Sequence, residues 1–382
     1  MSKVLPMDRP WRIHLRRGMQ DVQEGRYDRA VQAFEKAFDL GPDEPEVLVS
    51  LGRERFRQGL YEESEELLQA ALKRNPESAI AAATLARLLG LHLDRRQEAF
   101  QILHQALRHN PNAAALHVIR GELLLEDGAY KDARAAFGQV LDHDAADEAA
   151  RTGVARTYNI EGIKLSEQYE YEPAIFAFKR AADLDPNWSG PLVNLGVTFG
   201  RMGKLDKAIE AYSSALDRDP TNPVAYFNLG TAHHELGNYQ AAVAMFEDLL
   251  SLAPDFPRVR AALANVLGEL KEYDRTIALL LEELEIDNKS ASSWASLGLA
   301  YICCGNTERG EECLKRALAL DPGYLNAHYT LAMFYVTQKR LDEAEKTLVN
   351  VFRLNPRQTV KVFANAAHFD PVLEIENLNF LV

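Results

Sequence analysis

Histidine and cysteine could bind a metal or carry out catalysis in this chain, so their spacing decides which chemistry is open. His233 and His234 are adjacent in a helical pattern and point to different faces, which prevents both from chelating one ion. Cys303, Cys304 and Cys313 lack the C-x-x-C spacing of a zinc or redox motif, and we expect them to pack against apolar neighbours. The sequence therefore predicts no metal, no cofactor and no enzyme activity.

Composition restricts the partners and the compartment. The chain has 382 residues, a formal net charge of −13 and an isoelectric point near 5.3. A general nucleic-acid binder needs a basic surface, so we expect no nucleic-acid partner. Three clustered cysteines do not make a disulfide framework, which indicates a reducing compartment and a cytoplasmic protein. No stretch has the length of a membrane span and the first residues lack the apolar core of a signal peptide, so we expect no membrane insertion.

A proline recurs along the chain at a nearly constant interval, after phrases such as ALKRNP and ALDRDP. The marker positions are Pro42, Pro76, Pro111, Ala145, Pro186, Pro220, Pro254, Asn288, Pro322 and Pro356, with Ala and Asn as substitutions. The steps are 34, 35, 34 and 41 residues, followed by five steps of 34. Ten repeated units therefore cover residues 11–358.

Each unit carries a helical pattern twice. In the unit that ends at Pro220, the large apolar residues are Leu192, Leu195, Phe199 and Tyr212, and the small ones are Gly196, Ala208 and Ala215. Spacings of three and four place each set on one helical face. Small residues fit where two helix backbones approach closely, and large residues fill the space between helices.

This pattern resembles the tetratricopeptide repeat over nearly the whole chain. The ninth unit reproduces most of the signature with Trp294, Leu297, Gly298, Tyr301, Gly305, Leu314, Ala317 and Pro322. The resemblance implies an all-α fold, a right-handed superhelical solenoid of about ten helix–turn–helix repeats with a C-terminal capping segment. A single hairpin cannot bury its own apolar face, and stacking of hairpins does so.

Departures from the period suggest domain boundaries. Residues 1–10 form an N-terminal extension, 11–147 a block of four repeats, 148–358 a block of six, and 359–382 a capping helix with an apolar tail. The first repeat of the second block is seven residues too long. Seven residues are about two helical turns, so we expect one extra turn on each helix of that hairpin. A continuous solenoid with a local bulge is the alternative.

The resemblance implies that the first helix of each hairpin lines a concave groove. Asn194 and Asn228 hold the same groove position in consecutive units. An amide donates and accepts hydrogen bonds, so such a row can hold the backbone of an extended peptide. The arrangement resembles the asparagine ladder in the repeat domain of O-GlcNAc transferase, although NLG is also common repeat vocabulary. The other candidates in this C-terminal groove are Val197, Phe227, Thr231, Asn265, Leu299 and Tyr329.

Arginine occupies the groove positions nearer the N-terminus. The candidates are Arg12, Arg16, Arg53, Arg57, Arg87 and Arg156. A row of guanidinium groups favours an acidic or carboxylate-bearing partner. The alternative is internal pairing, for example with Glu46 or Glu122. The Lys–Asn–Lys–Arg set of the two-carboxylate clamp in Hsp90-binding family members is absent from these positions.

These patterns predict a non-catalytic protein–protein interaction adaptor that holds an extended or helical segment of a partner protein in its groove. One alternative is a self-associating scaffold, since the tail HFDPVLEIENLNFLV (368–382) combines acidic and apolar residues. We expect this tail to cap the tenth unit, while homo-oligomer formation through a neighbour's groove stays open. A weaker alternative is a targeting subunit of an enzyme complex.

Overall fold

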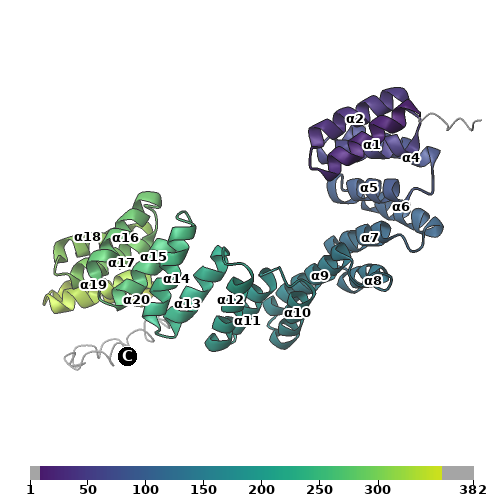
Figure 1. Cartoon of the computed structure of the whole chain (residues 1–382). Coiled ribbons are helices and arrows are strands. Elements are labelled where there is room, and N and C mark those ends of the chain that lie inside the picture. The colour runs from purple at the N-terminus through teal and green to yellow at the C-terminus, as the bar shows by residue number, and fades with distance from the viewer. Residues whose placement is uncertain (1–8, 355–382) are drawn as a thin grey trace, which may run out of the picture. The chain divides into compact units, whose positions relative to one another are not determined.

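The computed structural model describes residues 9–354, which form twenty α-helices and one short π-helix (Figure 1). Helices adjacent in sequence pack as pairs, such as α1 with α2, α3 with α4 and α17 with α18. The predicted all-helical fold of successive helix–turn–helix repeats is thereby confirmed. The predicted cap and tail, 359–382, and residues 1–8 of the extension lie outside the described residues.

The chain divides into two compact units, residues 1–195 (unit 1) and 196–382 (unit 2), with the boundary inside α11 (Gly190–Arg201). The helices of unit 1 before α11 are α1 (Pro10–Gln23), α2 (Tyr27–Leu40), α3 (Pro45–Arg57), α4 (Tyr61–Arg74), α5 (Ala79–Arg87), the π-helix η1 (Leu88–His92), α6 (Arg96–His109), α7 (Ala114–Glu126), α8 (Tyr130–Leu141), α9 (Glu148–Glu167) and α10 (Tyr171–Leu184). The predicted division of the repeats at 147/148 stays a prediction.

Unit 2 continues the same alternation of paired helices in its described part. Its helices after α11 are α12 (Leu205–Arg218), α13 (Pro223–Glu235), α14 (Tyr239–Leu252), α15 (Val259–Glu269), α16 (Tyr273–Ile286), α17 (Ala291–Cys303), α18 (Thr307–Leu320), α19 (Leu325–Thr337) and α20 (Leu341–Leu354). Leu249, Leu280 and Leu314 are fully buried between these helices. The core of the unit therefore lies along the stack of hairpins, as in a repeat protein.

Aromatic rings pack on glycines of the neighbouring helices. A Cβ atom added to Gly121 of α7 or to Gly153 of α9 would lie 2.6 Å or 2.4 Å from the ring of Phe137 on α8. In unit 2 the same relation joins Gly230 of α13 to Phe246 of α14, at 2.7 Å. The small residues of the repeat thus lie where helices approach closely, and the large residues fill the space between the helices, as their spacing predicts.

The seven additional residues of the fifth hairpin all lie in its first helix. Helix α9 has 20 residues, whereas α3 and α7 have 13 each, and α10 keeps 14. The expectation of one extra turn on each helix was therefore wrong. Seven residues advance a helix by nearly two whole turns, so α9 can absorb them all without rotating its packed face. Helix α10 keeps the usual 14 residues, and its Phe178 packs on Gly162 of α9.

The 35-residue step has a separate structural cause. Between Pro76 and Pro111 the first helix of the hairpin ends in the π-helix η1, Leu88–His92. A π turn takes up one residue more than an α turn, so it accommodates a single insertion without moving the flanking hairpins. Such turns occur often at functional sites, and η1 lies beside the hollow described below.

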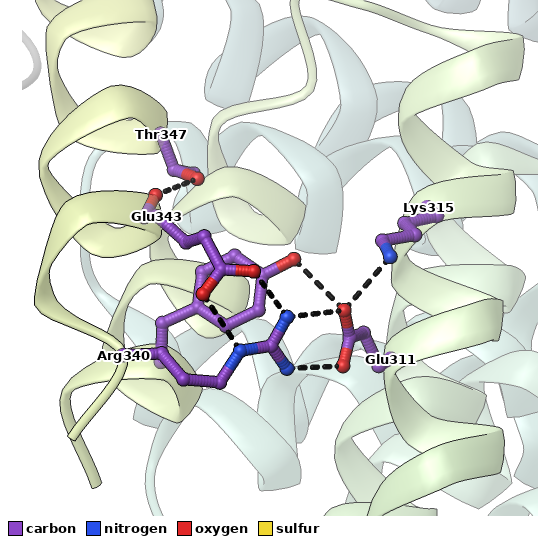
Figure 2. Close-up of polar contacts among 6 residues, drawn as sticks. Glu311, Lys315, Arg340, Glu343 and Thr347 are labelled. Atoms are coloured by element: carbon purple, nitrogen blue, oxygen red, sulfur yellow. Dashed lines mark hydrogen bonds and ion pairs between the residues drawn. The ribbon is translucent and has the colours of Figure 1, made fainter. Parts of the chain in front are cut away.

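An ion-pair network ties the last two described hairpins together (Figure 2). Arg340, immediately before α20, contacts Glu311 of α18 at 2.6 Å and 3.2 Å and Glu343 at 2.8 Å. Lys315 and the hydroxyl of Tyr335 also donate to Glu311, at 2.8 Å and 3.0 Å. The pKa of Glu311 is lowered to about 2, chiefly by the hydrogen bond from Arg340. The network stabilises the packing of α18, α19 and α20 in its charged form.

Candidate functional site

Three of the arginines predicted from the sequence meet at one concavity of unit 1. Arg57 at the end of α3, Arg87 at the end of α5 and Arg156 on α9 line a cavity of about 480 Å³. We call it the arginine hollow. Each of these helices is the first of its hairpin, so stacking of the hairpins brings together residues that lie far apart in sequence.

Apolar and aromatic side chains form the other wall of the arginine hollow. Phe56 and Tyr61 come from the junction of α3 and α4, and Leu91 and His92 come from η1. The His92 ring lies 5.0 Å from the ring of Phe56 and 5.2 Å from that of Tyr61, measured between centroids. The Tyr61 hydroxyl and His92 Nδ1 are 3.2 Å apart. Sequence reasoning missed this wall; the 35-residue step was a signal for its part in η1.

The arginines differ in their internal partners. Arg87 makes hydrogen bonds of 2.9, 2.9 and 3.2 Å to the carboxylate of Glu122 on α7, the internal pairing that the sequence left open. Arg57 lies 3.3 Å from Glu54 and 5.0 Å from the centre of the Tyr27 ring. Burial raises the pKa of Glu54, and the charge of Arg57 opposes that effect.

Arg156 differs from the other two arginines. It is exposed, and no carboxylate among residues 9–354 forms an ion pair with its guanidinium. Guanidinium groups form their strongest contacts as bidentate pairs with carboxylates. Arg156 is therefore the arginine of the hollow that is most available to an incoming carboxylate.

A second cavity adjoins the arginine hollow. It has a volume of about 500 Å³ and shares Glu122, Leu125 and Arg156 with its neighbour. Its other charged residues are Asp147 and Glu148 at the start of α9, where Asp147 accepts a hydrogen bond from the backbone of the helix it caps. Arg156 thus stands at the border between a basic, aromatic side and an acidic side of one continuous surface.

The remaining arginine candidates do not line the arginine hollow. Arg12 and Arg16 are exposed on α1, and the guanidinium of Arg12 lies 5.2 Å from the centre of the Trp11 ring. Arg53 is exposed on α3, one turn before Arg57. These side chains stay candidates for contacts to a longer partner segment.

The asparagine row has a rung in unit 1 that the sequence did not predict. Asn194 Nδ2 donates a hydrogen bond of 2.9 Å to Oδ1 of Asn159 on α9. Asn159 is 7% exposed and lies 35 residues before Asn194. The seven-residue lengthening of α9 hid this correspondence, because it shifts the residue count between the fifth and the sixth repeat.

The candidates on α13 in unit 2 are only partly exposed. The half-buried ring of Phe227 packs against Phe246 and Phe256, with centroids 5.7 Å and 5.5 Å apart. The Thr231 hydroxyl donates to the backbone oxygen of Phe227 at 2.8 Å. Asn228 is half-buried, and its amide makes no side-chain hydrogen bond within the described part of the chain.

The other candidates of unit 2 lie on four different helices. Asn265 on α15 accepts a 3.1 Å hydrogen bond from Ser296 of α17. Leu299 of α17 is 47% exposed, whereas Val197 of α11 and Tyr329 of α19 are half-buried. Neither cavity described above contains any of them.

The cysteines follow the prediction only in part. Cys313 packs in the core as expected, and burial raises the pKa of its thiol to about 11. Cys303 and Cys304 are exposed, which contradicts the prediction, because they are the last residue and the C-cap of α17 and lie outside its buried face. Within residues 9–354, no cluster of three or more His, Cys, Asp or Glu side chains could hold a metal ion.

No helix in the described part of the chain has both the length and the apolarity required to cross a membrane.

The family model described as the tetratricopeptide repeat matches residues 21–88, 91–157, 201–266, 233–300 and 305–359. All of these ranges are repeats, and no catalytic domain is identified among them. They cover more than half of the chain.

Two curated relatives match parts of the repeat region. The human protein O-mannosyl-transferase TMTC3 is 24% identical over 48% of this chain and 21% of its own length. Cellulose synthase operon protein C of Xanthomonas axonopodis pv. citri is 30% identical over 42% of this chain and 11% of its own length. The chain thus spans a minor part of both relatives. A crystal structure of the APC/C hetero-tetramer Cut9–Hcn1 aligns with 91% of this chain and 94% of its own, at 15% identity and a TM-score of 0.45.

Proposed function

We propose, since the chain belongs to the tetratricopeptide repeat family, that it is a non-catalytic adaptor that binds an extended or helical segment of a partner protein. Repeats of this family generally mediate protein–protein interactions. The observation that supports the proposal is the arginine hollow, where Arg57, Arg87 and Arg156 face an aromatic wall. A concave surface with apolar walls and a few charged groups is typical of a recognition site.

The chemistry of the hollow favours a partner segment that carries carboxylates beside apolar side chains. Arg156 can receive a carboxylate in a bidentate pair. Phe56, Tyr61 and Leu91 can pack against an apolar side chain, since each is only partly buried. Arg87 and Glu122, which form an ion pair with each other, also line the hollow.

Affinity capture with the full chain tests this proposal. Wild type, Arg156→Glu and the control Arg180→Glu are each used to isolate bound proteins from native lysate, which are then quantified by mass spectrometry. Arg180 is exposed on α10 and lines neither cavity, so its reversal makes the same charge change elsewhere. We expect Arg156→Glu to lower recovery of a partner at least fivefold and Arg180→Glu to retain it. Equal recovery with all three proteins would remove the hollow as the binding site.

The C-terminal groove is proposed as a further contact surface. Two residues support it. The side-chain amide of Asn228 makes no hydrogen bond within the described residues, and the apolar side chain of Leu299 is exposed to solvent. Asn228→Ala and Leu299→Asp, each in the capture experiment, test it separately from the hollow. Unchanged capture with both variants would exclude these positions.

A targeting subunit of an enzyme complex is a weaker alternative, supported only by the match to a part of a protein that is named a mannosyl-transferase. A cytoplasmic location is proposed from the three free cysteines of the chain. Microscopy of a tagged full chain tests the proposed location. Identification of enzymes that are purified together with the tagged chain tests the targeting role.

A further inference from the structure

We infer that the arginine hollow binds residues 368–382 of this same protein. The inference rests on the proposed function, because it names an occupant for the same site. The segment belongs to the 28 residues of the chain that follow residue 354, the last residue that the structure describes. Three features of the described residues and of the segment support this assignment.

The first feature is charge. Residues 368–382 contain Asp370, Glu374 and Glu376 and no lysine or arginine. Of the three guanidinium groups in the arginine hollow, that of Arg87 pairs with Glu122 and that of Arg57 lies 3.3 Å from Glu54, which leaves Arg156; Glu126 also lines the hollow. Arg156 is exposed without a carboxylate among residues 9–354. A carboxylate of a segment without lysine or arginine therefore complements Arg156.

The second feature is the alternation of side chains in the segment. Leu373, Glu374, Ile375 and Glu376 follow one another in the sequence. In an extended backbone, alternate side chains point to opposite sides, so the two apolar residues share one side and the two carboxylates the other. Such a segment presents an apolar edge and an acidic edge at the same time.

The third feature is the matching division of the hollow. Its aromatic wall consists of Phe56, Tyr61, Leu91 and His92, and its arginines come from the first helices α3, α5 and α9. An extended segment between them would place Leu373 and Ile375 on the aromatic wall and a carboxylate on Arg156. A volume of about 480 Å³ lies in the range of known ligand pockets.

Site-specific photo-crosslinking in the full chain tests the inference. Leu373→p-benzoylphenylalanine is irradiated and the crosslinked peptides are identified by mass spectrometry. We expect crosslinks to peptides that contain Phe56–Tyr61, Leu88–His92 or Arg156. Crosslinks confined to α19 and α20 would show that the segment caps the last hairpin, and would overturn the inference.

A charge exchange gives the inference a second test. In the crosslinking chain, Arg156→Glu is expected to reduce the yield at least fivefold, and Glu374→Arg in the same chain to restore it at least twofold. Arg180→Glu is the control and should leave the yield unchanged. Equal yields in all four proteins would contradict a contact between the segment and Arg156.

Mixed isotopic labelling identifies which copy supplies the segment. Labelled and unlabelled chains are combined before irradiation, and crosslinks that join the two labels come from different copies. Either source supports the assigned occupant. Failure of the inference differs from failure of the proposed function, since a chain that loses partners with Arg156→Glu but crosslinks only to α20 retains the adaptor function and loses this occupant.

Discussion

Arg87, at the end of α5, holds the carboxylate of Glu122 on α7 through three hydrogen bonds of 2.9, 2.9 and 3.2 Å. This pair spans 35 residues of sequence and joins the first helices of consecutive hairpins. It fixes the position of one guanidinium in the arginine hollow and neutralises one of its carboxylates. The relationship has consequences for both the stability of unit 1 and the charge of its surface.

Removing this pair should have a small, measurable cost. Both side chains are partly exposed, so we expect a coupling free energy of about 0.5–1 kcal/mol, as for other ion pairs near a surface. Arg87→Ala, Glu122→Gln and the double variant form a cycle, read by urea unfolding of the full chain. A coupling indistinguishable from zero would show that the contact does not stabilise the fold.

Gly153 should tolerate no side chain, unlike a glycine on the neighbouring helix. The Cβ of Gly153→Ala would overlap the Phe137 ring at 2.4 Å, so we expect a loss of about 1–3 kcal/mol in the free energy of unfolding. Gly138→Ala on α8 is the control, because its Cβ would meet nothing within 4 Å. That control should gain about 0.5–1 kcal/mol through the lower helix propensity of glycine. Destabilisation by both substitutions alike would contradict the packing explanation.

Lys271→Gly should stabilise the turn between α15 and α16. Lys271 has a φ of 62°, in the left-handed region that Gly237 adopts in the preceding hairpin with a φ of 76°. A residue with a Cβ is strained there by about 1–2 kcal/mol, partly offset by the greater unfolded-state entropy of glycine. We therefore expect a net gain of about 0.5–1 kcal/mol.

Amide hydrogen exchange of α15 and α16 in the full chain measures this gain locally. Gly237→Ala is the matched reverse substitution, and it should speed exchange in α13 and α14. Faster exchange in Lys271→Gly would mean that the lysine side chain contributes more than its backbone strain costs.

Acid should weaken the network in Figure 2 within a defined pH window. The pKa of Glu311 is lowered from 4.5 to about 2, so the unfolded chain binds a proton more readily than the folded one. The stability that this carboxylate contributes is fully present above about pH 4.5 and is lost as the pH falls toward 2. Glu311→Gln should lower the melting temperature at pH 7 and should flatten its decline between pH 4.5 and 2.

Calorimetry at pH 7, 4.5, 3 and 2 distinguishes this effect from general acid unfolding. Glu345→Gln, at an exposed position of α20, controls for the loss of one negative charge. Its curve should run parallel to that of wild type. If Glu311→Gln also ran parallel to wild type, the network would carry no pH-dependent stability.

Much of the candidate site could be inferred from repeat positions alone. Arg57, Arg87 and Arg156 were predicted to face a groove, and the structure gathers all three at one hollow. The aromatic wall was not predicted; Leu91 and His92 lie in η1, where the repeat departs from its 34-residue period, and Phe56 and Tyr61 come from the preceding hairpin. Internal pairing of the arginine row was left open by the sequence, with Glu46 and Glu122 as examples, and only the structure shows that Arg87 pairs with Glu122.

The sequence by itself determined the hairpins, because apolar residues three and four apart define a helical face and the 34-residue period repeats that face. Only the tertiary structure decided where irregular residues go. All seven additional residues lie in α9, since that helix packs on Phe137 through Gly153 and on Phe178 through Gly162. Both contacts keep their register when two nearly complete turns are added to one helix, and sequence spacing carries no record of which packed face must stay fixed.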